Sequence, residues 1–112
     1  MKKVLFVCLG NICRSPMAEA VFRKMVEDEN LSDKIFIDSA ATSSWEHGNP
    51  VHHGTRKRLA KEGIGVDGMF SRILNDNDLT FDYIIGMDES NISNIKKADL
   101  RKSLGHLNSR IR

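Results

Sequence analysis

The chain has 112 residues and a formal net charge of +2, with 17 basic and 15 acidic side chains. This length suits a single domain, residues 1–112, and the balanced charge argues against a dedicated nucleic-acid surface. No apolar run is long enough to cross a membrane, and Met1-Lys2-Lys3 leads straight into a predicted strand rather than a secretory leader. A cytoplasmic protein without a membrane or nucleic-acid partner is therefore the simplest expectation.

The chain opens with a predicted strand that leads through a short loop into a predicted helix. Lys3-Val4-Leu5-Phe6-Val7 is short and apolar, as is typical of a strand buried on both faces. Ser15 is expected to cap the helix and Pro16 to be its first residue, where the missing N–H costs nothing. Gly10 and Asn11 are residue types that tolerate positive φ. Such a loop brings its backbone N–H groups together beside a helix N-terminus, an arrangement that binds phosphate-like dianions.

The same loop carries the groups needed for nucleophilic chemistry on a bound phosphate. Cys8 follows the strand, and its thiolate form is favoured by the helix N-terminus and by Arg14. The planar guanidinium of Arg14 suits two oxygens of a phosphoryl group, and Ser15 can hydrogen-bond the sulfur as the intermediate breaks down. We predict a double displacement in which a phosphocysteine forms and water then cleaves it. The backbone expected to surround the phosphate is that of Leu9, Gly10, Asn11, Ile12 and Cys13.

Beyond this loop the chain continues to alternate strands and helices. Residues 35–39 are predicted to form a second strand, and a long polar loop follows to about residue 53. A basic helix is expected from about 55 to 62, a third strand at 81–87, and a last helix capped by Ser90. This alternation predicts an α/β fold with a parallel, doubly wound sheet and a site at the carboxyl ends of its strands.

Both cysteines of the chain lie in the predicted phosphate loop. With only Cys8 and Cys13 present, a structural disulfide framework is improbable. Two interpretations remain open. Cys13 either forms a reversible disulfide that protects a reactive Cys8 from overoxidation, or simply packs behind the loop.

The histidines do not predict a metal site. His47, His52 and His53 cluster in a polar loop, but no cysteine or carboxylate set completes a ligand pattern. A solvated loop explains them better, and we expect neither a metal nor another cofactor.

The motif VCLGNICRSPMAEA at residues 7–20 resembles the signature of the low-molecular-weight protein tyrosine phosphatases. The similarity continues through residues 38–45, 48–50, 71–72 and 81–91, in the family's order. The resemblance implies a flavodoxin-like, three-layer α/β/α fold with strand order 2-1-3-4. It also implies a cysteine-dependent hydrolase of phosphotyrosine proteins or small aryl phosphates.

The resemblance assigns the nucleophile and the phosphate-binding arginine to the two residues named above and adds supporting ones. It implies that Asn11 holds the loop through hydrogen bonds that reach Ser43. Trp45 would line the mouth of the cleft against the ring of the substrate, and Asp88 would help to organise the site. Met69 lies near the place where some relatives carry a histidine in the loop-support network, so a simplified network is expected here.

The chain departs from the family pattern at its C-terminal end. Relatives carry an Asp-Pro-aromatic loop whose aspartate protonates the leaving group, and no Asp-Pro occurs in residues 1–112. We therefore expect a C-terminally truncated member of the family that lacks its fourth strand and last helix and has reduced activity, because general acid catalysis contributes about 10²–10⁴-fold. An open edge on the third strand is also expected to favour self-association.

Three alternatives to a tyrosine phosphatase remain. A protein-arginine phosphatase resembles this motif but carries threonine at the position of Ile12. An arsenate reductase needs further downstream cysteines, and none follows Cys13. The third alternative is a phosphate-binding remnant without turnover.

Overall fold

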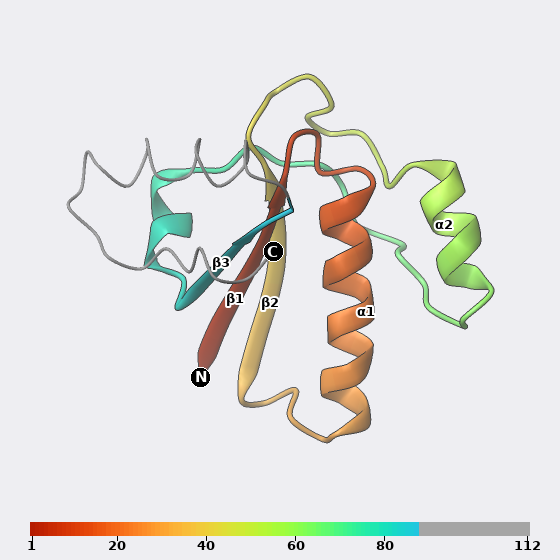
Figure 1. Ribbon diagram of the computed structural model, residues 1–112, viewed down its shortest axis with the longest axis vertical. Helices are drawn as coiled ribbons and strands as arrows, with labels where there is room; N and C mark the ends of the chain where they lie inside the picture. Colours follow the sequence, from red (N-terminus) through yellow and green to blue (C-terminus); the bar gives the residue numbers. More distant parts are fainter. Residues whose placement is uncertain (88–112) are drawn as a thin grey trace.

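The computed structural model describes residues 1–87, so the helix expected from Ser90 lies outside the described residues. Three parallel strands form one sheet in the order β2-β1-β3 (Figure 1). Their bounds, with those of the two α-helices and the short 3-10 helix η1, are β1 Lys2–Cys8, α1 Arg14–Asp28, β2 Ile35–Ala41, α2 His53–Ala60, η1 Asp76–Thr80 and β3 Tyr83–Gly86. The predicted parallel α/β fold and the 2-1-3 part of the predicted strand order are confirmed.

The central strand β1 is buried on both faces, as its apolar sequence requires. Leu5 and Val7 have no exposed surface and pack with Leu79 and Phe81 on one side of the sheet. Val4 and Phe6 point to the other side and join a cluster with residues of α1. Because side chains alternate along a strand, a continuous apolar run fills both interfaces at once.

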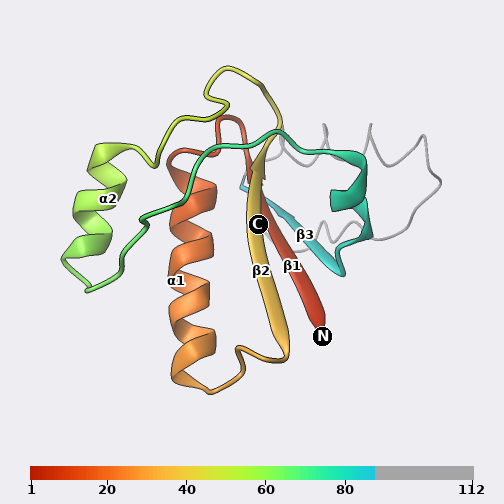
Figure 2. The same ribbon diagram turned by 180° about the vertical axis from the view of Figure 1, so that it is seen from behind.

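Helix α1 lies along one face of the sheet, and η1 lies on the opposite side (Figures 1 and 2). Helix α2 is further from the sheet and is joined to α1 by a separate apolar cluster that includes Ala20, Val51 and Leu59. Neither α-helix in residues 1–87 has the length and apolar character of a membrane-spanning segment.

This topology places the loop after β1 at the switch point of the sheet. The chain leaves β1 for β2 on one side and later returns to β3 on the other. Loops at such a point diverge and leave room for a ligand at the carboxyl ends of the strands. The loops after β1 and β2 lie together at that end, since Cys8 pairs with Ala41 where both strands finish (Figure 2).

Helix α1 begins earlier than its sequence predicts. Arg14 is its first residue, Cys13 occupies the cap position without a side-chain cap, and Ser15 is the second residue of the helix. The prediction that Ser15 caps the helix and Pro16 starts it is therefore wrong by two positions. Pro16 still lies in the first turn, where no intrahelical acceptor is needed, and the Ser15 hydroxyl bonds the loop instead.

Two further local features differ from expectation. Helix α2 begins at His53 rather than Thr55, because His52 acts as its cap and its Nδ1 accepts a hydrogen bond from the Gly54 N–H at 3.2 Å. Helix η1 was not predicted. It is held by a capping box in which Asn75 and Asp78 exchange side-chain and backbone hydrogen bonds. Five residues are too few to show a helical period.

The packing of η1 against the sheet is open to a direct test. Leu79 is 1% exposed and belongs to the same cluster as Leu5. We expect Leu79→Ala to lower the free energy of unfolding by about 2–5 kcal/mol, because it leaves a cavity. Met25→Ala, at a 57% exposed position on α1, is the control and should change it by less than about 0.5 kcal/mol. Urea unfolding followed by circular dichroism measures both, and equal losses would contradict this packing.

Candidate active site

The sulfur of Cys8 lies buried at the end of β1 and is contacted by two polar groups of the loop. Cys8 is 4% exposed. The backbone N–H of Asn11 donates to Sγ at 3.1 Å, and Ser15 Oγ lies 2.9 Å from the same atom. Both groups stabilise a negative charge on the sulfur if they donate to it.

The side chain of Asn11 holds the Ser15 hydroxyl beside the sulfur. Asn11 Nδ2 donates to Ser15 Oγ at 2.8 Å and to Ser39 Oγ at 2.9 Å, so both of its hydrogens are used. Ser15 Oγ thus accepts from Asn11, and its own hydrogen can be donated to Cys8 Sγ when the sulfur is a thiolate. A hydroxyl that donates to the sulfur favours the thiolate over the thiol.

Asn11 is itself held in place from the opposite side. Its Oδ1 accepts the backbone N–H of Arg72 at 3.1 Å, which fixes the orientation of the amide. Its φ is 57°, in the left-handed region that asparagine tolerates, as predicted. The same prediction is wrong for Gly10, which has no positive φ. A Cβ at Gly10 would lie 3.3 Å from Glu46 Cγ, a tight contact that a larger residue could make only if the Glu46 side chain shifted.

The carbonyl groups of the loop face outward. Three of them accept hydrogen bonds from surrounding segments: Leu9 from Ser43 N and Oγ (3.1 and 2.9 Å), Gly10 from Ser71 Oγ (2.7 Å) and Ile12 from His52 N (2.8 Å). All described peptide bonds are trans, so the N–H that follows each carbonyl points the opposite way, into the loop. The Asn11 N–H on the sulfur shows this directly. The loop is therefore a cradle of donors suited to an anion.

The prediction that the hydrogen bonds of Asn11 reach Ser43 is wrong. Asn11 bonds Ser39, which is buried within β2 and faces α1 and the loop. Ser43 follows the end of β2, and its hydroxyl donates to the Leu9 carbonyl instead. Ser43 thus supports the loop, but from the outside.

Arg72 belongs to the family motif at 71–72 but was assigned no role from the sequence, and it joins three parts of the structure. Its guanidinium bonds both carboxylate oxygens of Asp78 in η1 at 2.8 Å and Asp38 Oδ2 in β2 at 3.0 Å. The hydrogen bond to Asp78 is the main cause that raises the pKa of Arg72 above its ordinary value, so the guanidinium stays charged. These ion pairs position the backbone N–H that holds Asn11. No local pattern reveals them, because the partners come together only in the fold.

Comparison with known proteins identifies the family. A family model described as low molecular weight phosphotyrosine protein phosphatase matches residues 3–109. The chain belongs to this family. It is 50% identical over 108 residues to the low molecular weight protein-tyrosine-phosphatase YfkJ of Bacillus subtilis, and it covers 69% of that protein with 96% of its own length. It is 54% identical over 96 residues to the phosphatase of Rattus norvegicus, with 86% of this chain and 61% of the rat protein covered. The chain thus spans less than two thirds of the rat relative.

Solved structures agree with this family membership. The crystal structure of YfkJ matches with a TM-score of 0.90 over 96% of this chain and 68% of that one, at 50% identity. The structure of a Drosophila arginine phosphatase matches with a TM-score of 0.85 at 36% identity, over 90% of this chain and 63% of that one.

The remaining predicted residues of this phosphatase-family site are placed as follows. Arg14 is the first residue of α1 and has an exposed side chain, and Trp45 is 79% exposed in the loop after β2. Cys8 is a buried free thiol and Cys13 a half-buried one. A reversible disulfide between them and simple packing of Cys13 behind the loop therefore both remain predictions. Asp88 lies outside the described residues. Within residues 1–87 no group of three or more metal-ligating side chains comes together.

The ion pairs of Arg72 predict a large loss of stability when its charge is removed. Arg72→Met leaves the Asp78 carboxylate, 5% exposed, without its cation, and we expect the free energy of unfolding to fall by about 3 kcal/mol. Arg58→Met is the matched control, because its pair with Glu62 is about 60% exposed on both sides and should contribute no more than about 0.5 kcal/mol. Denaturant titration compares the two. A loss for Arg72→Met no larger than that of the control would contradict the proposed support of the loop.

Proposed function

We propose that this chain hydrolyses phosphate monoesters, with phosphotyrosine in proteins or small aryl phosphates as substrates and Cys8 as the nucleophile. The observation that carries the proposal is the buried sulfur, which accepts a hydrogen bond from the Asn11 N–H and lies 2.9 Å from the Ser15 hydroxyl. The sulfur lies in a loop in which the carbonyl groups of Leu9, Gly10 and Ile12 point away from it, toward partners in other segments. A site of this kind holds both an anionic nucleophile and an anionic substrate.

The reaction follows in two displacements. The phosphoryl oxygens bind the loop N–H groups and the guanidinium of Arg14, which also stabilise the charge of the transition state. The sulfur of Cys8 attacks phosphorus, the ester P–O bond breaks, and the phenolate leaves. Water then attacks the phosphocysteine, inorganic phosphate is released, and Ser15 stabilises the departing thiolate.

Protonation of the leaving group is the step that residues 1–112 support least. Its two prolines follow Ser15 and Asn49, so it contains no Asp-Pro pair of the kind that supplies the acid in relatives. A leaving group that departs without a proton should react readily, whereas tyrosine should react slowly. The difference expected from a missing general acid is about 10²–10⁴-fold.

The proposal predicts a marked dependence on the leaving group. Residues 1–112 should hydrolyse p-nitrophenyl phosphate measurably and a phosphotyrosine peptide at least about a hundredfold more slowly, because only the first leaves without a proton. Steady-state release of phosphate measures both. Vanadate should inhibit, and Cys8→Ser should abolish turnover, while Cys13→Ser controls for the loss of a thiol in the same loop.

Two outcomes would contradict parts of this account. Equal rates on both substrates would show that another residue supplies the proton. Turnover that survives Cys8→Ser would show that the sulfur is not the nucleophile. The absence of both turnover and vanadate inhibition would favour a phosphate-binding remnant.

Arginine phosphate is the second candidate substrate, because the structurally similar Drosophila protein is an arginine phosphatase. The resemblance favours tyrosine, since Ile12 stands where arginine phosphatases carry threonine. A phosphoarginine peptide in the same assay separates the two.

The proposed mechanism also needs Cys8 as a free thiol, which favours the reducing cytoplasm.

We also propose that the 112-residue polypeptide self-associates through β3. Among residues 1–87, β3 is paired with β1 alone, and an unpaired strand edge is a template for a second chain. Tyr83 is 38% exposed on this strand and lines an apolar pocket together with Val4, Phe6 and Ile85.

Sedimentation velocity over a range of concentrations tests the association. We expect a concentration-dependent increase in mass that Tyr83→Lys reduces, because an edge charge disfavours pairing. Met25→Lys places the same charge at a 57% exposed position of α1, away from the strand edges, and should have no effect. A monomer at all concentrations would refute the proposal.

A further inference from the structure

Helix α2 and the residue after it carry a concentration of positive charge that the proposed reaction does not use. Residues 53–61 contain four basic side chains and no acidic one: Arg56, Lys57, Arg58 and Lys61. The chain has 17 basic and 15 acidic side chains, so without these four cations its net charge would be −2 instead of +2. The positive charge of the protein is therefore concentrated in this segment.

One side of α2 is fixed to the protein, and the opposite side presents the cations to solvent. Thr55 and Leu59 are buried one helical turn apart, and Leu59 packs in the apolar cluster that contains Ala20 of α1. All four basic side chains are exposed. Because the buried side is anchored, the basic side has a fixed orientation.

Three of the four cations are available to an outside partner. Arg58 pairs with Glu62 at 3.0 Å, so its charge is offset. Arg56, Lys57 and Lys61 form no ion pair within residues 1–87. These three residues are called the cationic surface of α2 below.

The cationic surface begins next to the phosphate loop. The His52 N–H, just before α2, donates to the Ile12 carbonyl of the loop at 2.8 Å, and the start of α2 lies beside the first turn of α1 (Figures 1 and 2). The Arg56 N–H donates to the His52 carbonyl at 3.0 Å, so Arg56 lies one turn into the helix, about 6 Å along its axis. An extended peptide advances about 3.3 Å per residue. Residues two to four positions from a phosphotyrosine in the loop are therefore within reach of Arg56 and Lys57.

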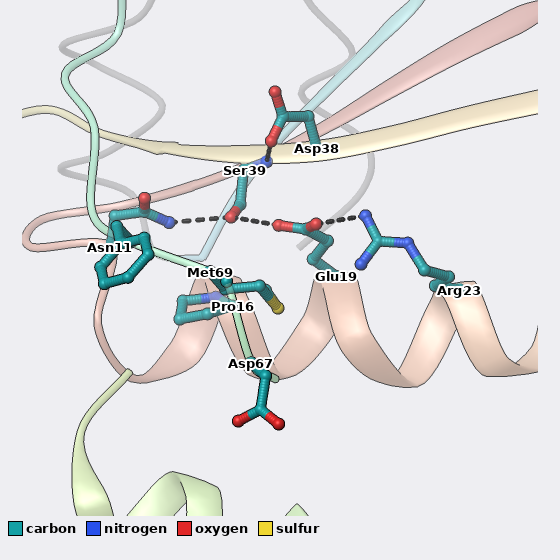
Figure 3. A pocket seen from close by; sticks show the side chains of 10 residues that line it. Asn11, Pro16, Glu19, Arg23, Asp38, Ser39, Asp67 and Met69 are labelled. Atoms are coloured by element: carbon teal, nitrogen blue, oxygen red, sulfur yellow. Dashed lines mark hydrogen bonds and ion pairs between the residues drawn. The ribbon is translucent and has the colours of Figure 1, made fainter. Parts of the chain in front are cut away.

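The acidic side chains behind the loop do not neutralise this surface. They line a pocket of about 310 Å³ between α1 and β2 (Figure 3). The buried Glu19 is bonded to Arg23, and Asp38 is bonded to Arg72. Asp67 lines the same pocket and forms no ion pair with the cations of α2.

A further carboxylate, Glu46, lies against the loop at Gly10, where a Cβ would be 3.3 Å from its Cγ. Its charge disfavours an acidic segment on that side of the loop. The acidic part of a bound substrate is therefore expected on the side of Ile12, where α2 begins.

We propose that the cationic surface of α2, chiefly Arg56 and Lys57, binds acidic residues that flank the phosphotyrosine of a protein substrate. The proposal rests on the proposed function, which puts the phosphoryl group of that tyrosine in the loop. An exposed ion pair contributes little by itself. Once the phosphoryl group is bound, however, the flanking residues are held at a high effective concentration beside α2.

Equilibrium binding of two labelled phosphotyrosine peptides tests the proposal, with fluorescence anisotropy as the readout and Cys8→Ser as the background that prevents turnover. One peptide carries Asp and Glu two to four positions from the phosphotyrosine on both sides, and the other carries Ser and Asn there. We expect the acidic peptide to bind about fivefold more tightly, as two exposed ion pairs allow. Arg56→Gln with Lys57→Gln should reduce this ratio below about twofold and leave the Kd of the neutral peptide unchanged.

The matched control is Lys2→Gln with Lys34→Gln. It removes the same charge from two exposed lysines that adjoin each other at the amino ends of β1 and β2, where the Lys2 N–H donates to the Lys34 carbonyl at 2.9 Å. This end is about 20 Å from Cys8 along β1, which is about two Debye lengths at 0.1 M salt. The control should leave the ratio unchanged, so that an effect of position is separated from one of net charge.

Charge reversal separates direct pairing from structural damage. Arg56→Glu with Lys57→Glu should bind a peptide with flanking lysines more tightly than the acidic one, because the complementary charges are exchanged. A damaged site would instead weaken all three peptides alike, and that result overturns the proposal. An unchanged ratio in the glutamine variant, an equal loss in the lysine control, or no binding of either phosphotyrosine peptide would also overturn it.

Two further measurements complete the test. Sedimentation with phosphatidylserine vesicles that depends on Arg56 and Lys57, without any preference between the peptides, would assign the surface to a membrane and reject the proposal. Hydrolysis of p-nitrophenyl phosphate by the unmodified chain is measured separately. No hydrolysis together with the expected binding ratios would reject the hydrolase and support the role of α2, whereas hydrolysis without a peptide preference would reject the role of α2 alone.

Discussion

The proposed chemistry depends on one constraint: a buried sulfur that attacks as an anion from the bottom of a loop must be surrounded by donors alone. Asn11 N–H and the Ser15 hydroxyl supply two of them at about hydrogen-bond distance from Cys8. Backbone groups occur in donor–acceptor pairs, so every donor turned inward requires a carbonyl turned outward that is satisfied elsewhere. The segments around the loop supply those outer partners, which explains why distant parts of the chain converge on it.

Three regions of the chain share this supporting task. The loop after β2 contributes Ser43, the segment before α2 contributes His52, and the segment before η1 contributes Ser71. Arg72 then fixes the last of these segments to β2 and η1 through its two carboxylate partners. The parallel sheet matters to function because it brings these segments to the carboxyl end of β1, where the loop begins.

Much of this arrangement is predictable from local sequence. The apolar run of β1 predicts a buried central strand, and the alternation of elements predicts the parallel sheet, both of which the structure confirms. The positive φ of Asn11 agrees with the tolerance of its residue type, but Asn75 has a φ of −131°, so residue type alone does not decide it. What sequence cannot supply are contacts between residues far apart in the chain: the pairing of Asn11 with Ser39 rather than Ser43, the ion pairs of Arg72, and the burial of Glu19. Local signals were also wrong where a side chain had a tertiary partner, since Ser15 bonds the sulfur instead of capping its helix.

The central claim is that the buried sulfur becomes covalently bound to phosphorus during turnover. It is tested most directly when the chain is quenched into denaturant during hydrolysis of an aryl phosphate and its peptides are sequenced by mass spectrometry. The account predicts phosphate on Cys8 that appears within the first turnover and disappears when substrate is exhausted. Phosphate on any other residue, or product release without a Cys8 adduct at any time point, would contradict it.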